Sequence, residues 1–448
     1  MPDYVLGEMF SGPGGIARGA EMANVQASKD GRASRTTHGW AVEYHPDTAQ
    51  TYKDNIRGAS DSSVFTADVR SFDLRSVPEF NAFAFGFPCN DFSTVGEHRG
   101  LDGEYGPLYM YGVHALALHR PDWFIAENVS GLSRANGGAA FGKILSALRR
   151  PTRAARQDPY FEDFYSDELG GLDLDLEYDL TANLYRFEEY GLPQKRHRIL
   201  IVGIRRDVAE KLERDFRVPA RTARNPRAQK SARVAIEVPP IPAGAPNHQR
   251  IKHSDAVVER LKAIAPGKNA FNTEFEDERL KLNVKGATLS NIYRRLDPDK
   301  PSYTVTGSGG GGTHMYHWDE PRALTSRERA RLQTFDDSFV FHGSHPSVRR
   351  QIGMAVPPEG AELVIDAVLK TLDAVDYASE PPNLDTYALI QRYEDLDAEA
   401  EADPQLSIEE PAPDPLDDPV RRFDIIAGTG APIDRSETIE TELRTGTS

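Results

Sequence analysis

Cys89 is the residue best suited to covalent chemistry, because it is the only cysteine among the 448 residues of the chain. It follows an apolar run at 84–87 and a proline, so we expect it where a buried strand turns into a loop. A thiolate is a strong nucleophile even when only a small fraction of the thiol is ionised. The usual role of a free cysteine is that of a small buried hydrophobe, and this stretch alone leaves both interpretations open.

Charged residues stand at the ends of two other apolar runs. Glu127, which is followed by an asparagine, closes the run that begins at Asp122. Strand ends of a parallel sheet meet at one edge, so Cys89 and Glu127 can face one pocket. Arg196 and Arg198 precede another apolar run and share one face of an extended chain. Both could therefore reach one anionic or carbonyl-rich ligand, although such a run is often only a solvated edge.

The N-terminal part of the chain is typical of a nucleotide-binding unit. A strand at 4–10 is followed by a glycine turn at 11–15 and then by a helix. Glu43 and Asp68 come at the ends of the next two apolar runs. We expect Glu43 to accept hydrogen bonds from ribose hydroxyls and Asp68 to accept from an adenine amino group. Together these strand ends predict a site for an adenosine-containing cofactor.

Alternating strands and helices predict an α/β fold, with a mostly parallel sheet and helices on both faces. The pattern weakens between 207 and about 293, which indicates an inserted region of different build. The glycine-dense run at 307–312 is either a flexible linker or a loop whose backbone lies close to a ligand. From Tyr377 onward Glu, Asp, Pro and Ala dominate, which predicts a disordered acidic tail.

The composition, with 39% hydrophobic residues, suits a soluble globular protein. No stretch approaches the ~20 apolar residues of a membrane helix, and the chain starts directly with a strand, so we expect no signal peptide. One cysteine excludes an internal disulfide, which fits the cytoplasm. The net charge of −16 argues against nucleic acid. However, Arg and Lys concentrate at 186–233 and acids from 373 onward, so the overall sign is a poor guide to the working surface.

Taken in order, the motifs resemble those of the DNA (cytosine-5)-methyltransferases over roughly residues 5–375. Each motif is weak alone, but the set in this order and spacing is highly specific. Met354 stands where the family usually has Asn, and Asn90 stands where many members have Gln. The matching segments are 10–15, 86–89, 127–129, 194–198, 322–325, 327–328, 330–333 and 351–357.

The resemblance implies an S-adenosylmethionine-dependent methyltransferase fold, with a Rossmann-like, mostly parallel sheet and a smaller target-recognition domain. It implies a catalytic domain at 1–206 and the target-recognition domain at 207–320. A C-terminal segment at 321–376 would pack back on the catalytic domain, and 377–448 would be the acidic tail.

The resemblance also assigns chemistry to particular residues. Cys89 would attack C6 of a flipped-out cytosine, and Glu127 would protonate N3 or hydrogen-bond to it. Arg198 would hold the base carbonyl, and Arg196 would help to position the base or its phosphate. The methyl donor would be S-adenosyl-L-methionine, and no metal is implied. The residues expected to bind this cofactor are Phe10, Gly12, Gly14, Gly15, Glu43, Asp68, Pro88 and Leu108. Those expected to bind DNA are Gln194, Thr304, Gly309 and Gly310.

The resemblance implies double-stranded DNA as partner, a monomer acting on it in the cytoplasm at the nucleoid, and a cognate restriction endonuclease where one accompanies the enzyme. Two alternatives stay open. A tRNA cytosine-5 methyltransferase shares the scaffold, but that branch carries a second cysteine, which this chain lacks. A catalytically impaired DNA-binding homologue is favoured slightly by Met354 and opposed by intact Cys89, Glu127 and Arg198.

Overall fold

The computed structural model describes residues 3–87, 108–282, 291–307 and 311–402. These residues form two compact units. The first unit contains the described residues of 3–186, 197–222 and 356–402, and the second contains those of 187–196 and 223–355. Each unit is therefore assembled from segments that are far apart in the sequence.

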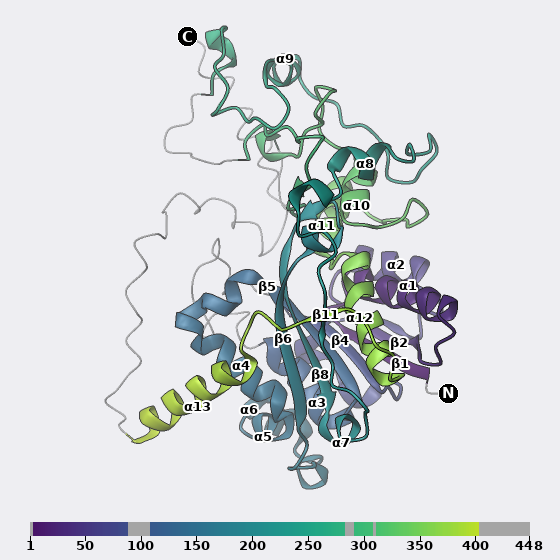
Figure 1. The fold of residues 1–448 in the computed structure, drawn as a ribbon, viewed down its shortest axis with the longest axis vertical. Helices are drawn as coiled ribbons and strands as arrows, with labels where there is room; N and C mark the ends of the chain where they lie inside the picture. Colours follow the sequence, from purple (N-terminus) through teal and green to yellow (C-terminus); the bar gives the residue numbers. More distant parts are fainter. Residues whose placement is uncertain (1–2, 88–107, 283–290, 308–310, 403–448) are drawn as a thin grey trace. The chain divides into compact units, whose positions relative to one another are not determined.

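The first unit is built on a seven-stranded sheet with the strand order β3-β2-β1-β4-β5-β8-β6 (Figure 1). Strands β1 to β5 pair in parallel, and β8 runs antiparallel to both of its neighbours, β5 and β6. The predicted mostly parallel α/β sheet is thus confirmed. The strands are β1 Asp3–Met9, β2 Arg35–Glu43, β3 Val64–Thr66, β4 Ala82–Gly86, β5 Trp123–Val129, β6 Tyr178–Arg186 and β8 His197–Arg205.

Helices cover both faces of this sheet, as strand alternation on β1 makes clear. Glu8 and Met9 are adjacent and point to opposite faces. The Glu8 carboxyl accepts a hydrogen bond from the Tyr52 hydroxyl of α2, whereas Met9 packs in the core cluster with residues of α3 and α4. The helices of this unit are α1 Gly15–Lys29, α2 Pro46–Asn55, α3 Tyr109–His119, α4 Ala139–Arg149, α5 Pro151–Arg156, α6 Pro159–Tyr165, α7 Arg206–Ala209, α12 Pro358–Leu372 and α13 Thr386–Ala402.

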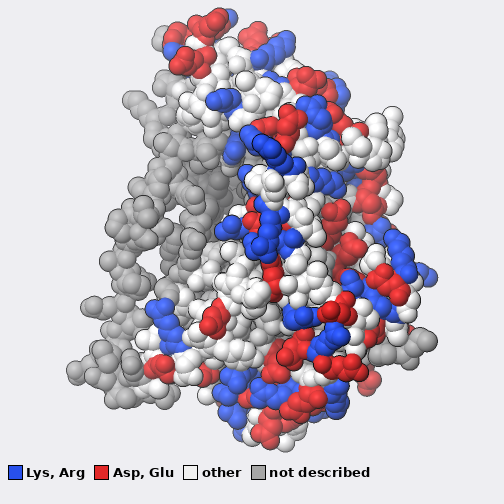
Figure 2. Space-filling view, in the orientation of Figure 1, with Lys and Arg blue, Asp and Glu red and all other residues white. Residues whose placement is uncertain are grey.

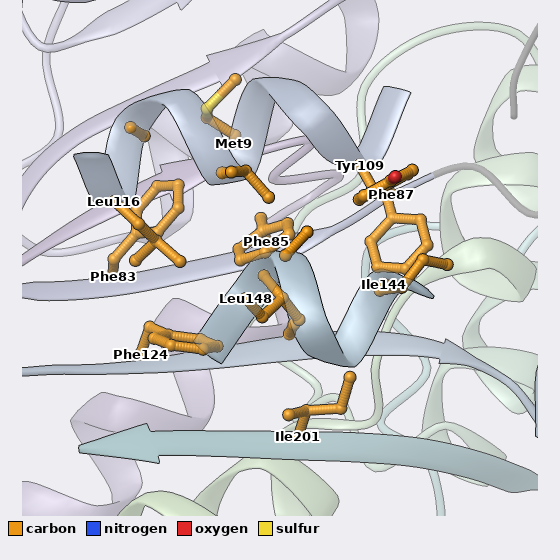
Figure 3. Packing of buried hydrophobic residues seen from close by; sticks show 14 of the residues in the cluster. Met9, Phe83, Phe85, Phe87, Tyr109, Leu116, Phe124, Ile144, Leu148 and Ile201 are labelled. Atoms are coloured by element: carbon orange, nitrogen blue, oxygen red, sulfur yellow. The ribbon is translucent and has the colours of Figure 1, made fainter. Parts of the chain in front are cut away.

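An aromatic-rich core lies between the sheet and helices α3 and α4 (Figure 3). Phe83 and Phe85 of β4 are fully buried, and their rings stack with centroids 5.1 Å apart. A side chain at Gly112 of α3 would collide with the Phe85 ring, so the helix can approach only because that residue is glycine. The core thereby fixes the strand that leads toward Cys89.

The second unit has shorter elements. Its described helices and strands are β7 Gln194–Lys195, α8 Ala232–Glu237, α9 Asp255–Ala263, β10 Ser302–Tyr303, α10 Ser326–Leu332 and α11 His345–Met354. Strands β7 and β10 pair in parallel. Helix α10 begins with a capping box in which the Thr325 hydroxyl accepts from the Glu328 N–H and the Glu328 carboxylate accepts from the Thr325 N–H.

Three predicted boundaries differ from those of the described units. Residues 187–196, predicted in the catalytic domain, belong to the second unit, and 207–222, predicted in the target-recognition domain, belong to the first. Of the segment 321–376, residues up to Ala355 belong to the second unit, and only the part from Val356 onward joins the first unit, where α12 packs on α1. The two helices pack so closely that a methyl group at Gly19 of α1 would overlap Ala361 of α12. Figure 1 shows these two helices side by side.

The predicted tail at 377–448 is not disordered over its first part. Strand β11 (Ser379–Glu380) pairs antiparallel with β9 (Val218–Pro219), and α13 packs on α4. Ile390 of α13 is 1% exposed, and the Thr386 hydroxyl accepts from the Ala182 N–H of β6 at 3.0 Å. The acidic composition hid an apolar stripe on this helix, which the sheet edge and α4 bury. Residues 403–448 lie outside the described part.

None of the described helices has the length and apolar character needed to cross a membrane.

Candidate active site

The glycine turn between β1 and α1 has an unusual backbone conformation. Phe10, Gly12 and Gly14 have φ angles of 53°, 57° and 97°. A non-glycine residue rarely adopts such an angle, and those that do cluster at ligand sites. A methyl group at Gly12 would meet no atom within 4 Å, so the main chain there is open to a ligand beside the N-terminus of α1.

Gly14 and Gly15 in the same turn have packing reasons. A methyl group at Gly14 would press on the side chain of Ile56, and one at Gly15 would overlap the carbonyl oxygen of Val356. Their expected contact with a cofactor stays a prediction, while the close approach of α2 and of the chain before α12 already requires glycine at both positions.

Glu43, the last residue of β2, contacts the glycine turn directly. It is 9% exposed, its Oε2 accepts from the Gly12 N–H at 3.0 Å, and its Oε1 accepts from the His45 N–H at 2.9 Å. The carboxylate therefore ties the end of β2 to the turn. Two residues predicted from separate strand ends to bind one cofactor are neighbours in the structure.

Asp68 follows β3 and is held by Arg70. Its Oδ1 accepts from the Arg70 N–H at 3.0 Å, and its Oδ2 forms an ion pair with the guanidinium at 2.7 Å. Hydrogen bonding to Arg70 lowers the pKa of Asp68, so the carboxyl is ionised and able to accept. An adenine amino group at this position would share the carboxylate with Arg70.

Glu127 and Arg198 form an ion pair at the C-terminal end of β5. The Arg198 Nε lies 2.8 Å from Glu127 Oε1, and the two side chains are 12% and 16% exposed. Strand β8 pairs Leu200 with Glu127 and Arg198 with Val129, so the two charged residues lie diagonally on one face. Gly86 ends β4 beside them, and a methyl group there would come within 3.1 Å of Glu127 Oε2.

Asn128 holds the chain just before Cys89, a role that the sequence pattern did not predict. It is 2% exposed, its Nδ2 donates to the Phe87 carbonyl at 3.1 Å, and its Oδ1 accepts from the Val129 N–H at 2.8 Å. Phe87 is the last described residue before Cys89. Asn128 thus fixes the point from which the cysteine-bearing segment starts. Its place directly after Glu127 at a strand end was the available signal.

The prediction that Arg196 and Arg198 share one face is wrong. Strand β7 ends before Arg196 and β8 begins after it, so the extended chain on which alternation depends is broken there. The Arg196 side chain is buried in the second unit. Its NH1 donates to the carbonyls of Val305 at 3.3 Å and Gly353 at 2.9 Å, and its NH2 to those of Met354 at 3.4 Å and Ala355 at 2.9 Å. These main-chain acceptors occupy the nitrogens that were expected to contact a base or a phosphate.

Gln194 is likewise an internal connector instead of the expected DNA contact. It is fully buried, its Nε2 donates to Gln333 Oε1 at 2.6 Å, and its Oε1 accepts from the Val305 N–H at 2.7 Å. Thr304, which precedes Val305, is half-buried, and its hydroxyl donates to the Lys195 carbonyl at 2.6 Å. The motif at 194–198 therefore supports the stretch that contains Thr304.

The remaining predicted residues divide into two groups. Leu108 is 8% exposed at the start of α3 and packs in the core cluster, and the Phe10 side chain packs against the same cluster. The others lie outside the described residues: Pro88, Cys89, Gly309 and Gly310.

The glycine turn suits an adenosine-containing cofactor. The turn offers exposed main chain at Gly12, the positive end of α1 and a carboxylate acceptor at Glu43. At the neighbouring strand ends, Glu127 and Arg198 supply a carboxylate and a guanidinium that can hydrogen-bond to a planar polar ring.

Comparison with known proteins identifies the family. The C-5 cytosine-specific DNA methylases match residues 4–150 and 172–370. The Type II methyltransferase M.BbvI of Brevibacillus brevis is 48% identical over 378 residues, which cover 83% of this chain and 92% of that protein. The Type II methyltransferase M.NgoFVII of Neisseria gonorrhoeae is 34% identical over 367 residues, with 81% and 85% covered.

A solved structure supports the fold independently. A DNA modification methyltransferase encoded within an E. coli prophage superposes with a TM-score of 0.56 and 19% identity, covering 83% of this chain and all of that one. This agrees with the Rossmann-like methyltransferase sheet, and the family match spans both the strand ends described above and the second unit. The chain belongs to the family of C-5 cytosine-specific DNA methylases.

Proposed function

We propose that this sequence-specific DNA (cytosine-5)-methyltransferase acts by covalent addition of Cys89 to its target base. The Cys89 thiolate would form a bond to C6 of cytosine, and the displaced electron pair would make C5 nucleophilic. After C5 takes the methyl group, loss of the C5 proton to water restores the double bond and expels the thiolate. The target carbon is unreachable inside stacked DNA, so the base must be flipped out of the helix.

The pairing of Glu127 with Arg198 is the observation that carries this proposal. As electrons enter the ring, N3 becomes basic. Glu127, after taking up a proton from water, would donate that proton to N3 and take it back when the thiolate leaves. Arg198 would donate to the carbonyl oxygen, where negative charge develops. Both side chains come from paired strands of a rigid sheet, and Asn128 anchors the chain just before Cys89. Glu127 and Arg198 lie close together, as this mechanism requires.

The proposed methyl donor is S-adenosyl-L-methionine, which supplies an electrophilic methyl group when bound. Its adenosine part would be held by the glycine turn with Gly12 and by Glu43, and Asp68 would accept from the adenine amino group. The glycines at 14 and 15 would contribute by letting α1 start close to this site.

We propose double-stranded DNA as substrate, with Thr304 contacting its backbone and the region around Gly309 and Gly310 reading the bases. The enzyme would act as a monomer in the cytoplasm, at the nucleoid. The Type II names of its relatives support a companion restriction endonuclease, which would be blocked by the methylation that this enzyme introduces.

Expression in a host without cytosine methylation, followed by genome sequencing for 5-methylcytosine, tests the activity. We expect methylation confined to one short motif, and none with Cys89→Ala, whose DNA binding should persist because no phosphate contact is removed. Full methylation by the Cys89→Ala variant would refute the mechanism. A folded wild-type protein that leaves the genome unmethylated would refute the function.

The same strains distinguish the tRNA alternative. Bisulfite sequencing of transfer RNA should find no new 5-methylcytosine in cells with the wild-type enzyme. Modified tRNA with unmodified DNA would move the assignment to that branch of the family.

A further inference from the structure

Arg329 in α10 is a buried cation, and two of its three nitrogens meet no acceptor among the described residues. The residue is 1% exposed, and its Nε and NH1 atoms have no hydrogen-bond partner within the part of the chain that the structure describes. Burying an unpaired guanidinium is costly, because the charge gives up its hydration without compensation. A protein that keeps such a group needs it for something other than its own stability.

Arg327, two positions before Arg329 on the same helix, is an arginine with a structural role. It is also fully buried, but its three nitrogens are all engaged. Nε donates to the Pro246 carbonyl at 3.0 Å, NH1 to the Asp336 carbonyl at 2.6 Å, and NH2 to the Phe339 carbonyl. The helix can therefore satisfy a buried arginine with main-chain carbonyls, and it does not do so for Arg329.

The charged side chain that acts most strongly on Arg329 is Arg349, which adds a positive charge instead of neutralising one. Arg349 of α11 is partly exposed, and its NH1 lies 3.0 and 3.2 Å from the two ring nitrogens of His314, one of which accepts its hydrogen bond. Burial, with Arg349 and Arg329 beside it, lowers the pKa of His314 to about 2, so the ring stays neutral and accepts. Burial and Arg349 lower the pKa of Arg329 to about 10, which leaves it protonated at pH 7.

Among the described residues, no carboxylate acts on the charge of Arg329. The described residues whose charge acts on Arg329 are Arg349, Tyr303 and Tyr316, and none of them is acidic. Both tyrosines belong to the stretch around Thr304 and the glycine run. The excess of positive charge thus lies beneath the stretch for which a phosphate contact was predicted from sequence.

The arginine-rich segment at 186–233 differs in this respect. Several of its arginines pair with acids, as in Arg206 with Asp179 at 3.1 Å, Arg221 with Glu380 at 2.8 Å and Arg233 with Asp299 at 3.4 Å. On the face drawn in Figure 2, Lys and Arg side chains lie among Asp and Glu side chains. Local density of arginine in the sequence therefore does not locate the uncompensated charge.

We propose that Arg349 and Arg329 form an anion site for one backbone phosphate of the DNA substrate. Arg349, which is partly exposed, makes the contact, and Arg329 adds a second positive charge from behind it in a poorly solvated setting where charge acts strongly. The phosphate supplies the negative charge that this part of the second unit lacks. The inference rests on the proposed function, since it names a contact to the same substrate.

The test compares Arg329→Met with Arg327→Met in the full-length protein. Binding to a duplex of random sequence is measured between 50 and 200 mM salt. Arg349→Met removes the phosphate contact itself, so it should weaken binding about tenfold at 0.1 M salt and flatten the slope of log affinity against log salt by about 0.9. Arg329→Met removes the charge behind that contact, so it should lower the affinity and flatten the slope in the same direction. Arg329→Met should also raise Tm, because an unpaired buried charge is removed.

Arg327→Met should do the opposite. It removes three satisfied hydrogen bonds, so Tm should fall, while the folded protein keeps its salt slope. Arg327→Lys, measured in the same way, serves if the methionine variant does not fold. Opposite signs of the Tm change in the two arginine variants would separate an anion site from ordinary packing.

Each outcome bears on the proposal. An unchanged affinity and slope for Arg329→Met, or a fall in Tm with the slope unchanged, would overturn the phosphate site. If the wild type methylates DNA while Arg329→Met binds normally, only this inference fails. If the wild type neither methylates nor binds DNA, the proposed function is refuted, and the phosphate site, which rests on it, is refuted as well.

Discussion

Arg196 and Arg198 are two residues apart in one sequence motif, yet the structure puts them to different uses in different units. Arg198, in the first unit, faces a single carboxylate at a strand end, and both partners keep some exposure. Arg196, in the second unit, is surrounded by the main-chain carbonyls of residues 305 and 353–355. An ion pair at the end of a sheet can rearrange toward a substrate, whereas a guanidinium enclosed by carbonyls holds loops together.

The residues of one family motif are therefore not all catalytic groups. Gln194 and Arg196 support the segment around Val305 and the end of α11, so they act on the substrate only through the loops they position. Arg198 and Glu127 are the pair with chemistry of their own. Substitutions should therefore separate loss of turnover from loss of stability along the two regions.

Glu127→Gln should give the largest effect among substitutions that preserve the fold. The amide can still accept from Arg198, but it cannot supply a proton to N3, so kcat should fall by about 10²- to 10⁴-fold. Single-turnover methylation of a duplex measures this loss, and Tm should stay close to that of the wild type. A kcat equal to that of the wild type would show that Glu127 does not supply a proton to N3. Glu127 would then not differ from Arg196 in its effect on turnover.

Arg196→Met should lower the free energy of unfolding by about 2–4 kcal/mol, because buried carbonyls lose a charged donor. Thermal unfolding and denaturant titration measure this change. The folded fraction should retain a kcat much closer to the wild-type value than Glu127→Gln does. A variant with wild-type stability and a collapsed kcat would show instead that Arg196 contacts the reacting base.

Truncation after Asp376 tests how much α13 stabilises the first unit without changing Glu127. Ending the chain after Asp376 removes α13 with its buried Ile390, which should cost about 2–3 kcal/mol of stability. Ending it after Ala402 keeps the helix and should change the stability little. Urea unfolding of the two proteins measures the difference, and equal midpoints would mean that α13 adds nothing to the fold.

Glu8→Gln should have the smallest effect, visible as a pH dependence. Burial raises the pKa of Glu8 to about 8, so the folded protein keeps a proton that the unfolded chain releases above its ordinary pKa of 4.5. Wild-type stability should therefore decline between about pH 4.5 and pH 8 through this group. The glutamine variant lacks that decline, so its Tm advantage over the wild type should be larger at pH 8.5 than at pH 5.5.

A Tm difference that is the same at both pH values would show that Glu8 is already ionised in the fold. Glu8 would then resemble Glu127, whose partner is a cation, instead of a neutral buried acid bonded to the Tyr52 hydroxyl.

The local pattern of the sequence determined the first unit well. The apolar runs before Phe10, Glu43 and Glu127 form the strands β1, β2 and β5, and Glu43 and Glu127 meet the partners that a shared sheet edge implies. Strand ends are predictable because a buried parallel strand needs a continuous apolar run, and the residue that breaks it must face the ligand edge. Composition misled at α13, because a single apolar stripe is enough to dock a helix that is otherwise acidic.

What only the tertiary structure decided is which charges are compensated. Arg196, Arg327 and Arg329 look alike in sequence. The carbonyls that accept from the first two come from segments up to about 160 residues away, whereas Nε and NH1 of Arg329 meet no acceptor among the described residues. The same holds for Gly15, which is required by the approach of Val356 rather than by its place in a motif. Hydrogen bonding and steric overlap are short-range in space and indifferent to sequence separation, so their partners appear only when the chain is folded.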